Sequence, residues 1–228
     1  NCGIEMSTGR YLGFVDCYDE IDPDMYEMLI SLALSERADM ALCSMRNVYE
    51  GKNKVQRSKD ERYLTKVMDA KEAVLCVMEG EMNSVSPVNK LYKRRLFSGT
   101  RYPVGKDLGE DASVIVELLM KCKRVVLTDA PGYTYIHRKD SITTRKFSRR
   151  DLSIIEAYIK NYYLIKNNFP DIVDVAVMRL CWAHFFVLDK LLVSDNREEH
   201  KDIESRMIIF LWKNMRYILS DSRLTKER

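Results

Sequence analysis

The chain has 228 residues, of which 46% are hydrophobic and 31% are charged, a composition typical of a globular protein. Its formal net charge of +3 is too small to indicate a nucleic-acid partner, and no apolar run approaches the roughly 20 residues that span a bilayer. Six cysteines are scattered singly along the chain, with no Cys-x-x-Cys pair. This spacing indicates neither a zinc site nor a disulfide framework, and it favours the reducing cytoplasm.

The first informative stretch joins a short apolar run to a dense group of acids. Residues 11–15 are mostly apolar, as in a buried strand, and five acids follow within nine positions: Asp16, Asp19, Glu20, Asp22 and Asp24. Pro23 is expected to open a helix with Asp22 as its N-cap. A strand that ends in acids just before a helix places them at the carboxyl edge of a sheet, where open α/β sheets bind ligands. The stretch is therefore either a site for Mg²⁺ or Mn²⁺, which prefer oxygen ligands, or a solvated loop that caps a helix.

The next elements are predicted from hydrophobic periodicity and from residues that begin or end helices. We expect a helix over residues 23–37, a strand over 38–49 and an exposed loop or edge hairpin over 55–65. Asp69 and Glu72 have the spacing of a capping box, and Gly80 is placed to end the helix that they begin.

A basic segment follows at residues 87–97. Lys93, Arg94 and Arg95 are typical of a solvated basic face. Alternatively, Lys90 or Arg94 contacts a phosphate or a sugar acid, and the sequence does not decide between these interpretations.

The second half of the chain becomes increasingly helical. Residues 110–120 predict a helix in which Glu110 and Asp111 lie in the first turn, where acids favour the helix dipole. A short buried strand is expected over residues 124–128. Three helices are expected over residues 154–165, 173–193 and 203–219, with a break at Pro170. Trp182 and His184 have the spacing of core residues, whereas the third helix is either part of the core or an interfacial helix with aromatic and basic anchors.

Four segments, in order, resemble family 2-type glycosyltransferases with the GT-A fold. They are Asn1-x-Gly3-Ile4 with Ser7-x-Gly9-x-Tyr11-Leu12-x-Phe14-Val15-Asp16, then Asn89-Lys90-Leu91-Tyr92-Lys93-Arg94, then Glu110-Asp111, then Tyr133-x-Tyr135-x-x-Arg138-x-x-Ser141-Ile142. The resemblance implies an α/β fold: the C-terminal part of a GT-A domain over residues 1–147, followed by a helical extension over 148–228. It also implies that the family's N-terminal nucleotide-binding units are missing, so that this fragment alone is inactive.

The resemblance assigns roles to individual residues. Asp16 and Asp19 would hold a divalent cation, Mn²⁺ or Mg²⁺, against the donor diphosphate, and Asp111, with Glu110 beside it, would be the general base. Arg138, on a flexible loop that folds over the donor, would contact the diphosphate, with His137 and Lys90 as further candidates. The chain departs from the family's Asp-x-Asp-Asp pattern at Tyr18, and a neutral phenol is a poor ligand for a hard cation.

The implied function is sugar transfer from a nucleotide-diphosphate donor to a saccharide or lipid-linked acceptor. Among such donors, a UDP-sugar is the first candidate. Inversion at the anomeric carbon, surface polysaccharide synthesis and a cytoplasmic location, with peripheral contact at the inner membrane face, belong to the same expectation. Two alternatives stay open: a degenerate, non-catalytic member that binds a saccharide or a partner, and a helical interaction module on an α/β scaffold.

Overall fold

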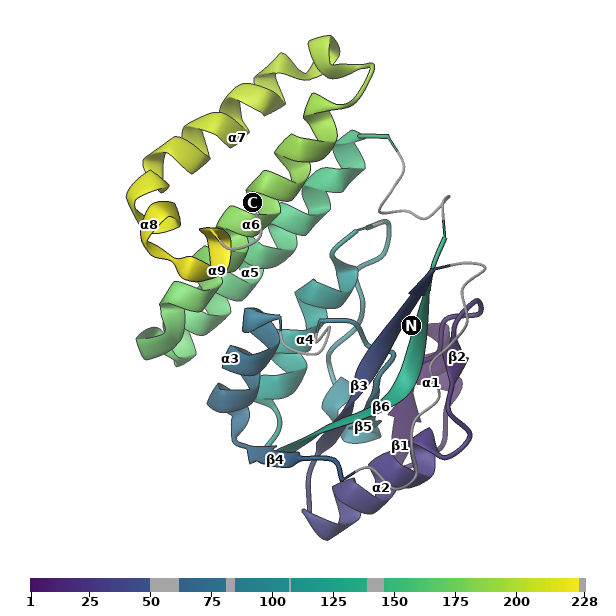
Figure 1. Cartoon of the computed structure of the whole chain (residues 1–228). Helices are drawn as coiled ribbons and strands as arrows, with labels where there is room; N and C mark the ends of the chain where they lie inside the picture. The colour runs from purple at the N-terminus through teal and green to yellow at the C-terminus, as the bar shows by residue number, and fades with distance from the viewer. Residues whose placement is uncertain (50–61, 81–84, 107, 139–145, 226–228) are drawn as a thin grey trace. The chain divides into compact units, whose positions relative to one another are not determined.

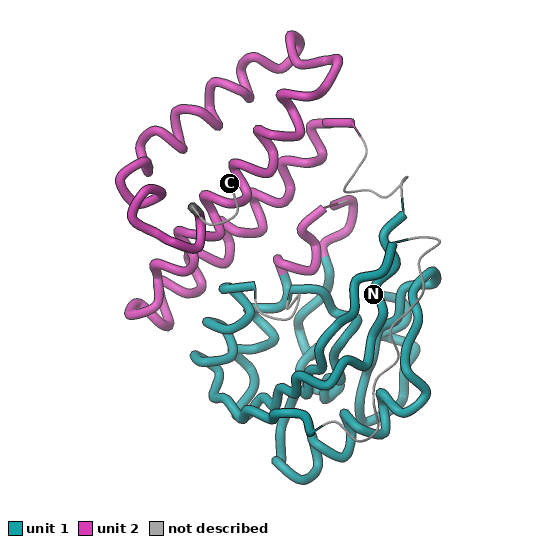
Figure 2. The backbone as a smooth tube through the Cα atoms, in the orientation of Figure 1, with its two compact units in different colours: residues 1–102, 114–141 teal, residues 103–113, 142–228 magenta. Residues whose placement is uncertain are grey.

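The computed structural model describes residues 1–49, 62–80, 85–106, 108–138 and 146–225 (Figure 1). The chain forms two compact units (Figure 2). Unit 1 consists of residues 1–102 and 114–141, and unit 2 consists of residues 103–113 and 142–228.

Unit 1 is built on one mixed sheet. Its strands are β1 (Tyr11–Gly13), β2 (Glu20–Ile21), β3 (Met40–Tyr49), β4 (Thr65–Met68), β5 (Lys90–Lys93) and β6 (Val125–His137). The strand order is β1-β5-β3-β6-β2, and β4 also pairs with β6. Strands β3 and β6 are parallel, and the other pairs are antiparallel.

Strand β6 is much longer than the sequence predicts. The apolar run at residues 124–128 indicated its first part, but the strand continues to His137 because it pairs along the whole of β3 as far as Tyr49. The expected flexible loop is therefore wrong for residues 133–137, which are strand. The rest of that loop, residues 139–142, lies outside the described residues.

Helix α2 (Met25–Ser35) packs on this sheet through one apolar face. Met25, Leu29 and Ala33 recur at helical spacing and are buried in a cluster with residues of β3, β5 and β6. Gly132 of β6 permits this close approach, since a Cβ atom there would lie 2.8 Å from the Met25 Cγ. The other helices of unit 1 are α1 (Cys2–Met6), α3 (Ala70–Glu79), the short 3₁₀ helix η2 (Arg94–Phe97) and most of α4 (Glu110–Met120).

The predicted start and end of α3 are confirmed. The Asp69 carboxylate accepts a hydrogen bond of 2.9 Å from the Glu72 backbone N–H, and the Glu72 carboxylate accepts one of 2.9 Å from the Asp69 N–H. Gly80 ends the helix with φ of 85°, which a glycine adopts without steric cost. The loop or hairpin expected over residues 55–65 lies mostly outside the described residues.

In the basic segment at β5, Arg94 and Arg95 are exposed, as expected for a solvated face, and Lys93 and Arg95 also form ion pairs. The Asp39 carboxylate lies 2.8 Å from the Lys93 Nζ and 2.7 Å from an Arg95 Nη. Burial would raise the pKa of Asp39, but hydrogen bonds from Lys93, the Lys123 backbone N–H and Arg95 outweigh it and hold the pKa at about 2. These cations therefore tie β5 to the start of β3.

Unit 2 is mainly helical. Its helices are α5 (Ser153–Asn168), α6 (Val173–Leu192), α7 (Lys201–Lys213), α8 (Met215–Ser220) and α9 (Ser222–Thr225), with 3₁₀ turns η3 (Arg149–Leu152), η4 (Pro170–Ile172) and η5 (Arg197–His200). Helix α6 packs on α5 and on α7 (Figure 1). The expected third helix is two helices, since the chain turns at Asn214, whose side-chain amide donates to the Phe210 carbonyl at 2.8 Å. Among the described residues, no helix combines the length and the apolar character needed to cross a membrane.

The interior of unit 2 matches the prediction for one of two candidate core residues. His184 is buried and its ring stacks on Phe210 with 3.6 Å between centroids, whereas Trp182 is half-buried. Asp151 is fully buried and lies 3.3 Å from the Lys190 Nζ. A buried carboxylate needs such a partner, so this pair fixes the start of α5 against α6.

Candidate functional site

The acidic stretch crosses the end of the sheet from β1, at one edge, to β2, at the other. Asp19 is held there by β6: one carboxylate oxygen accepts a hydrogen bond of 2.8 Å from the Tyr133 hydroxyl, and the other accepts one of 2.9 Å from the Ile136 backbone N–H. The same Tyr133 oxygen accepts a hydrogen bond of 3.1 Å from the Asp16 backbone N–H. Tyr133 thus fixes both acids of the predicted metal site, although it lies more than a hundred residues away in the sequence.

The electrostatics of this arrangement favour a cation. Burial and the neighbouring Asp19 carboxylate both raise the pKa of Tyr133, whose proton is therefore retained and donated to Asp19. Partial burial, and then the charge of Asp19, raise the pKa of Asp16 as well. The two carboxylates therefore repel each other in a site that solvent screens incompletely, and a bound cation would relieve that repulsion.

Asp22 does not have its predicted role. The N-cap of α2 is Asp24, and Asp22 instead pairs with Arg46 of β3, both side chains being largely buried. The Arg46 Nε also donates to the Thr134 hydroxyl of β6 at 3.2 Å. The N-cap prediction is wrong because the partner that binds Asp22 comes from a strand, which local spacing does not reveal. The contact anchors the acidic stretch to both central strands.

Arg138 and His137 lie at the end of β6. The Arg138 guanidinium carbon lies 3.9 Å from the centroid of the Tyr18 ring, a cation–π contact. Tyr18, at the position where the family pattern has an acid, thus holds Arg138 beside the acidic stretch. The His137 Nε2 lies 3.0 Å from the Asn47 side-chain oxygen, and its ring stacks on Tyr49 of the neighbouring strand.

Lys90 is fully buried, and this position does not suit a surface contact with phosphate. Its Nζ donates to the Ser86 carbonyl at 2.5 Å and to the Asn89 side-chain oxygen at 2.7 Å. The Asn89 amide in turn donates to the Cys43 carbonyl at 2.5 Å. The sequence did not show that Lys90 is buried, because it lies in a run of basic residues. Alternate side chains of a strand point to opposite faces, and the sequence alone does not say which face is covered.

Glu110 and Asp111 lie in the first turn of α4, within the part of that helix that belongs to unit 2. Three hydrogen bonds from α5 hold this segment. The Ser153 hydroxyl donates to the Leu108 carbonyl at 2.6 Å, the Asn161 amide to the Ala112 carbonyl at 2.8 Å and the Lys160 Nζ to the Ser113 carbonyl at 2.8 Å. Asp16 and Asp19 belong to unit 1, so the structure describes the two groups of acids separately.

The predicted ligands suit a weakly held hard cation. No group of three or more His, Cys, Asp or Glu side chains gathers as a metal site in the described parts of the chain. Asp16 and Asp19 supply carboxylate oxygens alone, which is the donor type for Mg²⁺ and Mn²⁺ when substrate phosphates and water complete the coordination. Tyr18 is 64% exposed and turned toward Arg138, so it leaves the ligand set at two carboxylates.

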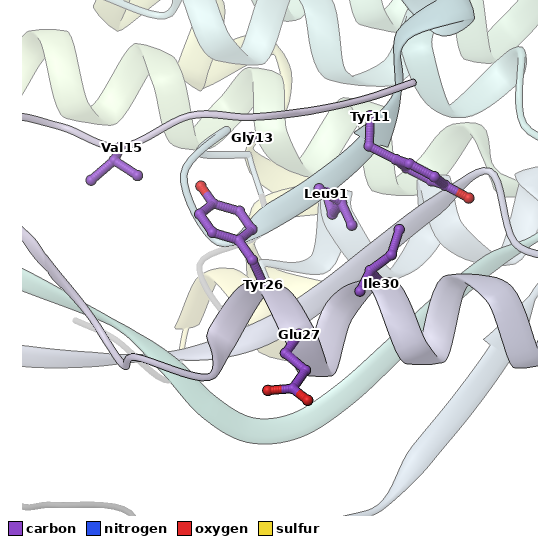
Figure 3. Close-up of a pocket in the computed structure, with 7 residues that line it drawn as sticks. All are labelled: Tyr11, Gly13, Val15, Tyr26, Glu27, Ile30 and Leu91. Carbon is purple, nitrogen blue, oxygen red and sulfur yellow. The ribbon is translucent and has the colours of Figure 1, made fainter. Parts of the chain in front are cut away.

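An apolar hollow of about 640 Å³ lies between β1, β5 and α2 (Figure 3). It is lined by Tyr11, Gly13, Val15, Tyr26, Glu27, Ile30 and Leu91. The lining carries a single carboxylate and includes none of the candidate site residues. Gly13 is required there, because a Cβ would come within 2.5 Å of the Tyr26 ring.

Comparisons with known proteins find similarity in the part of the chain that contains this site. Residues 1–100 match the model for glycosyl transferase family 2. The match covers β1, the acidic stretch and β5 but ends before Asp111 and Arg138.

Two curated relatives extend the similarity. The glycosyltransferase GlyA of Streptococcus pneumoniae is 28% identical over 78% of this chain and 26% of its own length. The processive diacylglycerol β-glycosyltransferase of Mycoplasma pneumoniae is 22% identical over 72% of this chain and 50% of its own length. The chain therefore spans between a quarter and a half of these relatives.

Solved structures confirm the expected α/β fold class. The crystal structure of Staphylococcus aureus TarS 1–349 in complex with UDP-GlcNAc superposes with a TM-score of 0.61, covering 92% of this chain and 59% of that one. The sequence identity is only 15%, so the likeness concerns the fold. The predicted GT-A-type architecture followed by helices is thus confirmed.

Proposed function

We propose that the whole protein transfers a sugar from a nucleotide-diphosphate donor to a saccharide or lipid-linked acceptor, with inversion at the anomeric carbon. The observation that carries the proposal is the pair of acids at the end of the sheet: Tyr133 binds the Asp19 carboxylate and the Asp16 backbone N–H, and Arg138 lies on Tyr18, which is between them in sequence. The match of residues 1–100 to the model for glycosyl transferase family 2 supports the reaction class. Because the chain spans only part of its relatives, we expect the fragment alone to be inactive.

On the donor side, the departing diphosphate gains negative charge as the glycosidic bond breaks. Arg138 can form a bidentate pair with a phosphate once it leaves the Tyr18 ring, which costs only a weak cation–π contact. Mn²⁺ or Mg²⁺ held by Asp16 and Asp19 would supply further neutralisation of that charge. A UDP-sugar is the proposed donor, which the fold shared with the UDP-GlcNAc complex of TarS supports.

On the acceptor side, Asp111 is the proposed general base and Glu110 its neighbour in the same helical turn. The acceptor hydroxyl oxygen forms a bond to the anomeric carbon while the bond from that carbon to the diphosphate oxygen breaks. The acceptor proton passes to Asp111, and the nucleoside diphosphate leaves with the electron pair. Attack in line with the leaving group inverts the anomeric configuration.

The proposed setting is surface polysaccharide assembly in the cytoplasm, at the inner face of the membrane. The diacylglycerol named for the Mycoplasma relative supports a lipid-linked acceptor. With such an acceptor, the enzyme would meet its substrate at the bilayer surface.

A second candidate is a non-catalytic member that binds a saccharide or a partner. Tyr18 favours it, because this side chain removes one acid and engages the arginine that the reaction needs. A helical interaction module on an α/β scaffold is the third, for which the helices of unit 2 are the motivating feature.

An assay of the whole protein separates these candidates. The protein is incubated with radiolabelled UDP-sugars, Mn²⁺ and mixed saccharide or lipid-linked acceptors, and labelled product is measured for the native protein, Asp19→Asn and Glu20→Gln. We expect transfer by the native protein, loss of at least a hundredfold in Asp19→Asn and little change in the exposed neighbour Glu20→Gln. Saccharide binding without transfer supports the non-catalytic candidate, and the absence of both supports the interaction module.

A further inference from the structure

Helix α7 has two apolar faces, and only one of them is buried. Ile203, Met207 and Leu211 recur every four residues and are buried. On the opposite side, Ile208, Ile209 and Trp212 are 47%, 53% and 68% exposed. At 100° per residue these three lie within one quadrant or so of the helix, so they form a continuous patch, which we call the α7 outer face. Scattered apolar side chains are normal on a surface, but a cluster with an exposed tryptophan marks an interaction site.

Basic residues predominate around the α7 outer face. The acids of α7 are Asp202, which is exposed, and Glu204, which is buried and paired with Arg197. Residues 205–220 contain three basic residues, Arg206, Lys213 and Arg216, and no acid at all. All three are exposed. Arg206 has one weak, exposed contact of 3.5 Å with Asp202, and the described residues give neither Lys213 nor Arg216 an ion pair. A patch of isoleucine and tryptophan flanked by lysine and arginine has the composition of an interfacial helix.

We infer that the α7 outer face docks this chain on an anionic lipid bilayer. Trp212 and the two isoleucines would enter the boundary between headgroups and acyl chains, while the three cations contact acidic headgroups. The helix would lie in the plane of the membrane, because its buried face stays packed on α6, where His184 stacks on Phe210.

The charge pattern favours a bilayer over a second copy of the chain. A two-fold interface would bring the same face of two copies together, and so would bring two patches of net positive charge into contact. Like charges in a desolvated interface repel, whereas an anionic surface attracts all three cations. The inference does not depend on sugar transfer, since vesicle binding needs neither donor nor acceptor.

Vesicle sedimentation tests the inference with the full chain. The chain is spun with vesicles of phosphatidylcholine alone and with equimolar phosphatidylglycerol, and the partition coefficient is compared. We expect at least tenfold stronger partition to the anionic vesicles. Lys213→Glu with Arg216→Glu should lower it by about 25-fold or more, since each basic residue near such a surface contributes roughly fivefold. Lys66→Glu with Lys123→Glu, two exposed lysines of unit 1, is the matched charge control and should retain most of the binding.

The apolar half of the face needs its own variant. Ile208→Ser, Ile209→Ser and Trp212→Ser combined should lower partition at least tenfold, whereas Val104→Ser, which removes a side chain that is 90% exposed elsewhere in unit 2, should leave it unchanged. In a Trp182→Phe background, Trp212 is the single tryptophan, so its emission should shift to the blue on anionic vesicles and be quenched by brominated lipid.

Three results would overturn the inference. One is binding to neutral and anionic vesicles alike, or to neither. Another is equal binding by the face variants and their controls. The third is a concentration-dependent dimer, or a drop in melting temperature in the Trp212→Ser variant, without any loss of vesicle binding, which would assign the face to a second copy or to this chain's own interior. Failure of sugar transfer in the whole protein would affect none of these measurements.

Discussion

The two groups of candidate acids are held in opposite ways. Asp16 and Asp19 are fixed by a sheet: Tyr133 and the Ile136 backbone N–H, on a strand more than a hundred residues later, bind them directly. Glu110 and Asp111 are fixed by a helix: side chains of α5 hold the backbone around them. In the proposed function, the first arrangement would orient a carboxylate as a metal ligand, and the second would orient a helix end that carries the general base.

The largest expected effect separates these two roles. Asp111→Asn in the whole protein should lower kcat by about 10²–10⁴-fold with donor affinity almost unchanged, because a base acts on the acceptor proton in the transition state. Steady-state kinetics and nucleotide-diphosphate binding measure the two quantities. Glu110→Gln, one residue earlier, should cost much less. A near-normal kcat in Asp111→Asn would reduce this residue to the start of a helix.

The packing of the segment before Glu110 on α5 can be disrupted at Gly109. Its φ of 79° disfavours any side chain, and a Cβ would lie 2.7 Å from the Ile154 Cα of α5. Gly109→Ala should destabilise the chain by about 2–4 kcal/mol, from a left-handed backbone plus a backbone clash. Gly105→Ala is the matched control, since Gly105 has a φ of 75° but nothing within 4 Å of the added Cβ, and should cost only about 1–2 kcal/mol. Equal melting temperatures of the two variants would mean that α5 does not hold this segment closely.

The hydrogen bonds that join β6 to Asp16 and Asp19 can be removed at Tyr133. Tyr133→Phe removes both hydrogen bonds of the hydroxyl and leaves Asp19 and the Asp16 N–H short of a partner, at a cost of about 1–3 kcal/mol in the free energy of unfolding. Tyr135→Phe, on the same strand, removes a hydroxyl for which the described residues show no hydrogen bond and should cost less than 1 kcal/mol. Urea unfolding of both variants decides the matter, and equal losses would contradict the bridging role of Tyr133.

The smallest expected effect concerns metal affinity. Tyr18→Asp should bind Mn²⁺ several-fold more tightly than the native protein, because it adds a hard oxygen ligand beside Asp16 and Asp19. Asp19→Asn should bind Mn²⁺ more weakly than the native protein. Affinity should also fall as the pH drops, because the raised pKa of Asp16 lets protons compete with the metal from a higher pH than for an ordinary aspartate. Calorimetric titrations with and without UDP measure these changes. Absence of metal binding in all three proteins under both conditions would favour the non-catalytic candidate.

The sequence by itself determined the features that depend on neighbouring residues. The capping box of Asp69 and Glu72, the stop at Gly80 and the helices of the C-terminal region follow from hydrogen bonds and spacing within a few residues. The acidic stretch and the family resemblance were also visible, since they are strings of adjacent residues.

Only the tertiary structure decided which partners these residues bind. Strand β6 runs to His137 because β3 pairs with it. Asp22 forms an ion pair with Arg46 instead of capping a helix, and the buried Lys90 donates to Asn89. Tyr133 was visible in its motif, yet its contact with Asp19 spans 114 positions of the chain. Periodicity and capping report hydrogen bonds made within one or two turns, whereas a sheet joins residues whose separation in sequence is arbitrary. The geometry of the acidic site therefore exists only once β6 has paired.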